Sequence, residues 1–188
     1  LAALDLTTGQ LTAWDPGVLG ATSSPSISVG YTTLRSTLNA IANTPGKQTV
    51  YNALPQTSVP LDTGSATTVS VSTSIARAIL LADPTAQSTD KAAQIAFNSA
   101  VNFDFDSSDG VAGTDFQSVA THEIGHALGF TSRSGATNPT VPAVWDLYRF
   151  RSGTTAGTFT TAQRIMTIGG PTLNSQYYFV PGITEIGL

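Results

Sequence analysis

Apolar residues recur at three- and four-residue spacing most clearly in residues 114–129, which predicts an amphipathic helix there. The apolar positions of this helix are Phe116, Ala120, Ile124, Ala127 and Leu128. Thr114 and Gln117 have the spacing of a capping box at its start, and Gly129 stands where a helix commonly ends. We therefore expect Thr114 to cap the helix and the five apolar side chains to form its buried stripe.

Two further helices are predicted upstream of this one. The same spacing occurs over residues 31–43, and Pro45-Gly46 is expected to end that helix. A second amphipathic pattern covers residues 72–82 and stops before Asp83-Pro84, since the residue before a proline disfavours helical backbone.

Strand patterns lie between and after the predicted helices. Strict alternation of apolar and polar residues over 101–106 predicts a strand with one face in water, and residues 94–97 predict another strand. Residues 48–71 suggest short strands or an extended loop, and strand-like pieces occur near 145–150 and 176–180. Helices and strands in this arrangement are typical of an α+β fold.

The composition narrows the class of protein. The 188 residues show no repeat and no linker, so we expect one domain over 1–188, and the ending at Leu188 without a polar tail suggests a truncated C-terminus. There is no cysteine, and a net charge of −4 makes nucleic acid an unexpected partner. No apolar run is long enough to span a membrane. The hydroxyl-rich, lysine-poor composition suggests a secreted, cell-surface or periplasmic bacterial protein.

The candidate chemistry lies within the 114–129 helix, in the sequence His122-Glu123-Ile124-Gly125-His126. Residues four apart on a helix share a face, so His122 and His126 can bind one metal ion, for which zinc is the default. Glu123 lies beside them and can take a proton from the attacking water and return it to the leaving amine. The alternative is a surface helix with two solvated histidines.

This motif resembles that of the zincin metallopeptidases. Gly129, after the second histidine, resembles the glycine at which this helix ends in the metzincin branch. The stretch from Asn102 to Phe150 resembles exported bacterial proteases of this kind, distantly leishmanolysin-like. The resemblance implies a zincin-like fold, with a twisted mixed sheet backed by the helices at 31–43 and 72–82 and a zinc-carrying helix at 114–129. It also implies a zinc endopeptidase that acts on proteins or peptides.

The third zinc ligand is left open by the sequence. Metzincins commonly place a ligand six residues after the second histidine, where this chain has Ser132, a poor ligand. Asp146 is the candidate that could replace it as a ligand. The alternatives are that the Asp146 carboxylate orients a ligating histidine, or that it forms an ion pair with Arg149. Glu185 is a weaker candidate, and a ligand beyond Leu188 is the other possibility.

Other features have simpler interpretations. Met166 could imitate the methionine turn of metzincins, although a single methionine is more often part of a core. Residues 104–110 could hold Ca²⁺, but they lack the EF-hand glycine and glutamate, and we favour a strand followed by an Asp-Gly turn. Two other functions stay open: an inactive fragment or pseudoenzyme that acts as a binding module, and a Ser/Thr-rich adhesion domain without chemistry.

Overall fold

The computed structural model describes residues 2–4, 11–13, 17–81, 93–110, 112–135, 140–151, 154–155, 157–167, 176–180 and 183–187. The chain divides into two compact units. Unit 1 comprises Leu1–Pro25 and Gln87–Phe130, and unit 2 comprises Ser26–Ala86 and Thr131–Leu188. Each unit is described separately below, and the single domain over 1–188 stays a prediction.

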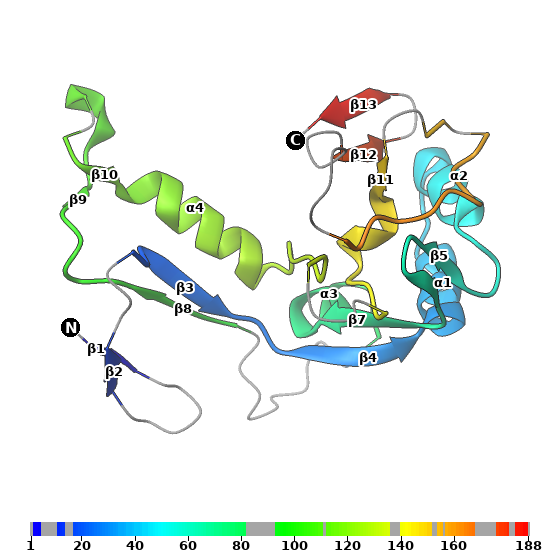
Figure 1. Ribbon diagram of the computed structural model, residues 1–188, viewed down its shortest axis with the longest axis horizontal. Helices are drawn as coiled ribbons and strands as arrows, with labels where there is room; N and C mark the ends of the chain where they lie inside the picture. The colour runs from blue at the N-terminus through cyan, green and yellow to red at the C-terminus, as the bar shows by residue number, and fades with distance from the viewer. Residues whose placement is uncertain are drawn as a thin grey trace. The chain divides into compact units, whose positions relative to one another are not determined.

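The described residues of unit 1 form three strand pairs, one long helix and a 3₁₀ turn (Figure 1). Its elements are β1 (Ala2–Leu4), β2 (Leu11–Ala13), β3 (Gly20–Ser23), β8 (Gln94–Phe97), β9 (Phe103–Asp104), the 3₁₀ turn η1 (Ser107–Asp109), β10 (Thr114–Asp115) and α4 (Phe116–Ala127). The pairs β1–β2 and β3–β8 are antiparallel, whereas β9–β10 is parallel. Helix α4 packs on β3 and β8. Strand β8 confirms the strand predicted over 94–97.

The ends of α4 have different caps. The carboxylate of Asp115 accepts hydrogen bonds from the backbone N–H groups of Gln117 and Ser118. The predicted cap at Thr114 is therefore wrong, because Asp115, one residue later, takes the capping position. At the other end, Gly129 adopts a φ of +98°, as a residue that follows a helix C-cap commonly does.

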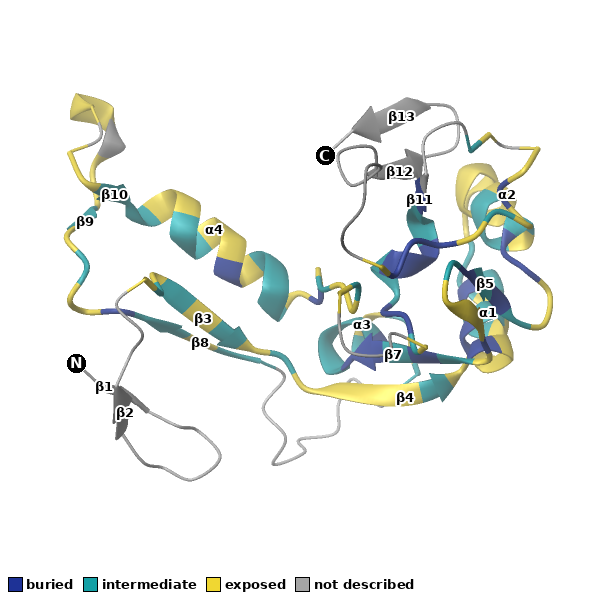
Figure 2. Ribbon diagram, viewed as in Figure 1, coloured by how far each residue is buried: buried dark blue, intermediate teal, exposed yellow. Residues whose placement is uncertain are grey.

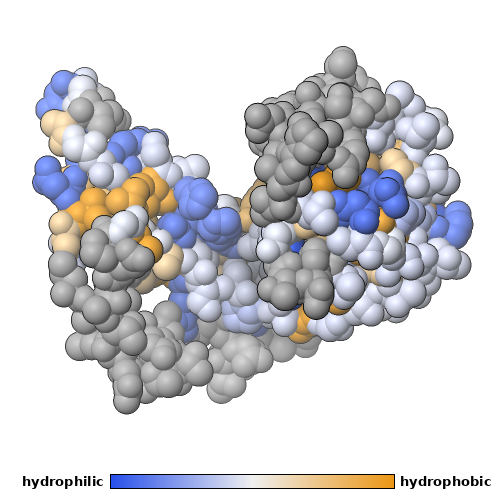
Figure 3. Space-filling model, in the orientation of Figure 1, coloured by the Kyte–Doolittle hydropathy of each residue, from blue (hydrophilic) through white to orange (hydrophobic). Residues whose placement is uncertain are grey.

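The apolar side chains of α4 are more exposed than the sequence predicts. Ile124 is 49% and Leu128 60% exposed, whereas Glu123 is the buried residue of the helix (Figure 2). The expected buried stripe is thus wrong at these two positions. Phe116 instead packs against the aromatic rings of Phe97, Phe103 and Phe105. Hydrophobic side chains gather at the surface near the start of α4 (Figure 3).

Where the structure describes unit 2, it has three α-helices and three small sheets. Its elements are β4 (Ser26–Gly30), α1 (Tyr31–Ala40), α2 (Pro45–Ala53), β5 (Val59–Leu61), β6 (Gly64–Ala66), β7 (Thr68–Ser72), α3 (Thr73–Ala78), the 3₁₀ turn η2 (Trp145–Tyr148), β11 (Arg149–Arg151), β12 (Gln176–Val180) and β13 (Ile183–Gly187). The sheets are β4–β7, β5–β6 and β11–β12–β13, all antiparallel. Helix α2 was not expected, because we took Pro45-Gly46 as a terminator. Pro45 is instead its first residue, and Thr44 is its N-cap.

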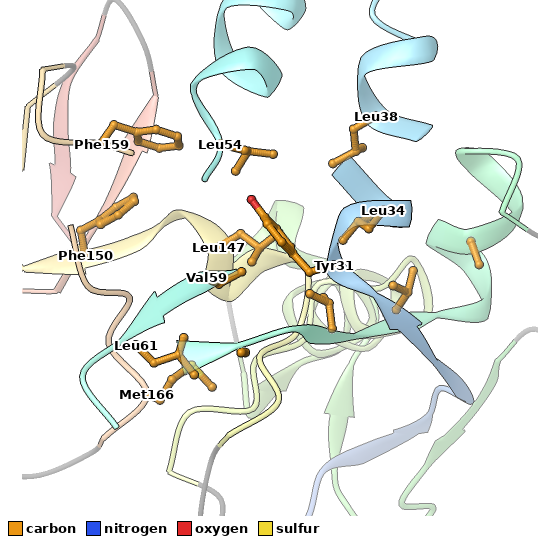
Figure 4. Packing of buried hydrophobic residues seen from close by; sticks show 14 residues of the cluster. Tyr31, Leu34, Leu38, Leu54, Val59, Leu61, Leu147, Phe150, Phe159 and Met166 are labelled. Atoms are coloured by element: carbon orange, nitrogen blue, oxygen red, sulfur yellow. The ribbon is translucent and has the colours of Figure 1, made fainter. Parts of the chain in front are cut away.

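A dense hydrophobic core lies in unit 2 (Figure 4). Helix α1 contributes Tyr31, Leu34 and Leu38, and β11 contributes Phe150. These side chains pack with buried residues of β5, β6, β7, α3 and η2, and with Leu54, Phe159 and Met166. The guanidinium of Arg164 is also buried, and its central carbon lies 4.7 Å and 5.2 Å from the ring centres of Phe150 and Phe159. Cation–π attraction compensates in part for its desolvation.

The architecture is mixed α and β with four α-helices among the described residues, which is compatible with a zincin-like fold. In place of the predicted twisted mixed sheet, the described ranges contain six small sheets with strands two to five residues long. Prolines, glycines and short turns interrupt the strands before a wider sheet can form. No helix in this part of the chain is long and apolar enough to cross a membrane.

Candidate metal centre

The two histidines of the motif lie one turn apart on α4 with their ring nitrogens facing each other. The Nε2 atoms of His122 and His126 are 3.0 Å apart. Two nitrogens bound to one tetrahedral zinc ion at about 2.0–2.1 Å lie about 3.3 Å from each other. The side chain of His122 is exposed and that of His126 is partly exposed, so an ion can reach both. The pair therefore fits two positions of a zinc site.

The orientation of His126 is fixed by the end of the helix. Its Nδ1 lies 2.8 Å from the carbonyl oxygen of Phe130. A carbonyl oxygen only accepts hydrogen bonds, so Nδ1 carries the proton and the Nε2 of the neutral ring keeps a free lone pair. This arrangement of a ligating histidine with its other nitrogen on a carbonyl is common in metal sites.

A Schellman motif brings the carbonyl of Phe130 to this position. The Phe130 N–H donates to the carbonyl of Gly125 and the Gly129 N–H to that of His126, both at 3.0 Å. The positive φ of Gly129 makes this turn possible. Gly129 was predicted to end the helix, whereas the role of the Phe130 carbonyl was not predicted; the glycine at the helix end is the signal for this turn.

The carboxylate of Glu123 lies between α4 and β3. Its Oε2 accepts a hydrogen bond of 2.6 Å from the hydroxyl of Thr22, and only 6% of the residue is exposed. A Cβ atom on Gly20 would lie 3.0 Å from the Glu123 Cγ, so the glycine leaves room for this side chain. The hydroxyl of Ser24 donates to the carbonyl of His126 at 2.8 Å. These contacts from β3 and the residue that follows it were not predicted.

The predicted third ligand, Asp146, lies in unit 2 and is fully buried. Its carboxylate accepts hydrogen bonds from the Ser132 hydroxyl and from the backbone N–H groups of Arg133 and Ala143. The Nη1 atom of Arg149 contacts the hydroxyls of Ser132 and Ser134. Asp146 therefore joins two loops of unit 2, and its role as a ligand stays a prediction.

Among the described residues, no group of three or more histidine, cysteine or acidic side chains is placed to hold a metal ion. Glu185 lies in β13, and its side chain is outside the described residues. Met166 is fully buried in the core of unit 2, which agrees with the simpler of its two interpretations. The structure thus brings His122 and His126 together.

The acidic residues at 104–110 contact backbone amides in the way that turn residues do. Asp104 accepts from the N–H groups of Asp106 and Ala112, and Asp106 accepts from Ser108. The hydrogen bonds from the Ser108 hydroxyl and N–H lower the pKa of Asp106. These contacts agree with a strand followed by a turn and give calcium no support.

Comparison with known proteins agrees with the motif. Residues 74–139, about a third of the chain, match the family model of Matrixin (Peptidase_M10), and the matched stretch contains the whole motif. No curated protein and no solved structure matches the chain. The Matrixin match supports a zinc peptidase family of the metzincin type, without favouring its bacterial or leishmanolysin-like branches.

Proposed function

We propose that this chain is a zinc-dependent endopeptidase with His122 and His126 as metal ligands and Glu123 as the general base. The observation that carries the proposal is the pair of Nε2 atoms at 3.0 Å, with the lone pair of His126 freed by the contact of its Nδ1 with Phe130. The Matrixin match independently supports zinc and peptide chemistry.

The roles of the residues follow from ordinary zinc peptidase chemistry. Bound zinc supplies a Lewis acid that polarises the scissile carbonyl and lowers the pKa of the attacking water. Glu123 accepts the proton of this water and donates it to the leaving amine. Asp146 is the proposed third ligand, although its three hydrogen-bond donors would have to leave it a free lone pair. The substrates are proteins or peptides, and the composition supports a secreted or cell-surface location.

One observation favours a second candidate, an inactive module that binds a partner without cutting it. The described residues provide two histidines but no third ligand beside them. A zinc peptidase needs three protein ligands and one open position. If the pair stays incomplete in solution, the helix would keep the motif without the reaction.

The proposal is tested by zinc content and by cleavage of a casein-type substrate. We expect about one zinc ion per chain, lost in His126→Ala and retained in Gln117→Ala, an exposed control on the same helix. Glu123→Gln should retain zinc but lower turnover by about 10²–10⁴-fold, because an amide cannot accept the proton. Unchanged zinc content in His126→Ala would contradict the ligand assignment. Zinc-loaded wild-type protein without cleavage would favour the inactive module.

A further inference from the structure

One face of β3 and its continuation contacts the motif helix at alternate positions. Gly20, Thr22 and Ser24 share this face and are partly buried, whereas Ala21 and Ser23 between them are exposed. Alternate residues of a strand point to the same side, so one short strand can contact successive positions of α4. Figure 1 shows β3 running alongside the helix, and the two elements pack together within unit 1.

The hydroxyl of Thr22 lies near two acceptors of the same residue. Its Oγ1 is 2.6 Å from the Glu123 Oε2 and 3.0 Å from the Glu123 carbonyl oxygen. A hydroxyl has one proton to donate, and the shorter, charge-assisted contact is the stronger of the two. Thr22 therefore holds one carboxylate oxygen and leaves the Oε1 atom of Glu123 without this donor.

Gly20, two residues before Thr22 on the same face of β3, lies beside the Glu123 side chain. A Cβ atom at this position would lie 3.0 Å from the Cγ, 3.2 Å from the Oε1 and 3.3 Å from the Cδ of Glu123. Contacts this short are tighter than ordinary van der Waals contact, so the Glu123 side chain would have to shift by a few tenths of an ångström. The glycine is needed here for space, since its φ is not among the positive values.

We propose that Thr22 is a positioning residue for Glu123, with Gly20 providing the room that this position requires. The inference rests on the proposed function, in which Glu123 moves the proton. The hydroxyl of Thr22 contacts the carboxylate and the carbonyl oxygen of Glu123, the residue that would move the proton, rather than a zinc ligand. Its removal should therefore change the proton-transfer step and leave zinc binding unchanged.

The test compares Thr22→Val, which keeps the shape but removes the hydroxyl, with Thr22→Ser, which keeps the hydroxyl. Ser23→Val is the matched control, because it places the same side chain on the exposed face of the same strand. In the full zinc-loaded chain, we expect Thr22→Val to lower kcat by about 10–100-fold with little change in KM. Thr22→Ser should restore most of the lost kcat, and zinc affinity should be equal in all four proteins.

A second measurement needs no activity. Thr22→Val should lower the melting temperature by about 3–10 °C in the wild-type background, because a hydrogen bond to a charged group is lost. In a Glu123→Ala background, the same substitution should have a clearly smaller effect, because only the hydrogen bond from the Thr22 hydroxyl to the backbone carbonyl of residue 123 is then left to lose. An equal fall in both backgrounds would show that Thr22 stabilises the strand without acting through Glu123, and would overturn the inference.

The outcomes separate this inference from the proposed function. If wild-type protein cleaves peptides and Glu123→Gln does not, a Thr22→Val variant with wild-type kcat overturns the positioning role alone. Failure of Thr22→Ser to restore kcat would also overturn it, since the hydroxyl would not be the active group. If zinc-loaded wild-type protein cleaves nothing, the proposed function fails and the positioning role fails with it. The melting experiment would then still report whether the two side chains interact.

Discussion

The two units of this protein bury different kinds of side chains. In unit 2, the buried residues are mostly hydrophobic and come from α1, the strands β5 to β7 and the segment that contains Phe150. In the described part of unit 1, the buried side chains are the polar Asn98 and Glu123, while Leu128 and Phe130 are more than half exposed. The candidate metal centre thus lies in the unit with the thinner hydrophobic core.

This difference shows how the candidate site is held. The side chains of Thr22 and Ser24 connect to α4 through hydrogen bonds to Glu123 and to the carbonyl of His126. The titratable groups differ in the same way. Burial raises the pKa of Tyr31 in unit 2 to about 12, whereas hydrogen bonds, first that from Ser118, lower the pKa of Asp115 in unit 1.

A pair of identical substitutions tests the comparison with the largest expected effect. Leu34→Ala, in the core of unit 2, should lower the free energy of unfolding by about 2–5 kcal/mol, because it leaves a cavity. Leu128→Ala, on the exposed end of α4, should change it by about 0.5 kcal/mol or less. Urea denaturation measures both. A similar large cost for Leu128→Ala would show that the apolar face of α4 is covered in solution.

Asp146 has two roles to distinguish, that of a buried hydrogen-bond acceptor within unit 2 and that of the proposed third zinc ligand. Asp146→Ala should lower the free energy of unfolding by about 1–3 kcal/mol, because the backbone N–H groups of Arg133 and Ala143 lose their buried acceptor. Hydrogen exchange should show the loss in unit 2.

The milder Asp146→Asn, which keeps an acceptor, distinguishes the two roles of the residue through zinc affinity. A loss beyond about 100-fold indicates a direct ligand, and a loss of about 10–100-fold or less an outer contact. Unchanged stability in Asp146→Ala would contradict the hydrogen-bond network.

Two glycines of unit 1 provide the next test. Gly129→Ala should destabilise the protein by about 1–2 kcal/mol, because its φ of +98° is unfavourable for a residue with a Cβ atom. Zinc binding should also weaken, because the displaced carbonyl of Phe130 would no longer orient the ring of His126. Gly125→Ala is the control: it lies inside α4 with open space around it, and should stabilise the helix by about 0.5–1 kcal/mol. Equal effects of both substitutions would show that the turn at Gly129 does not depend on its backbone conformation.

Parts of this structure that depend on local sequence were predictable. The spacing of His122 and His126 fixes their common face on any helix, and residues 94–97 form the strand that was predicted for them. Helix α2 was missed although Thr44 and Pro45 carry the usual signals of a helix start. The pair Pro45-Gly46 predicted the end of the preceding helix, because proline and glycine commonly follow the end of a helix and proline also commonly begins one.

Parts that depend on distant contacts were not predictable. Thr22 lies 101 residues before Glu123, and no periodicity links the two segments. The space around Gly20 likewise exists only once β3 packs against α4. The exposure of Ile124 and Leu128 was also missed, since a pattern of apolar residues shows which side chains share a face but not whether anything covers that face.

The smallest expected effect concerns pH and the cap of α4. The Asp115 carboxylate accepts hydrogen bonds from Ser118 and Gln117, which lower its pKa below the ordinary value of 3.8. A group with a lowered pKa stabilises the folded state above its unfolded pKa, and this contribution is lost as the pH falls through the folded pKa. Between about pH 5 and about pH 3, amide hydrogen exchange should therefore speed up in the first turn of α4, beyond its intrinsic pH dependence. Asp115→Asn caps the helix without titrating, so it should remove this dependence. The same pH response in Asp115→Asn would assign it to another group.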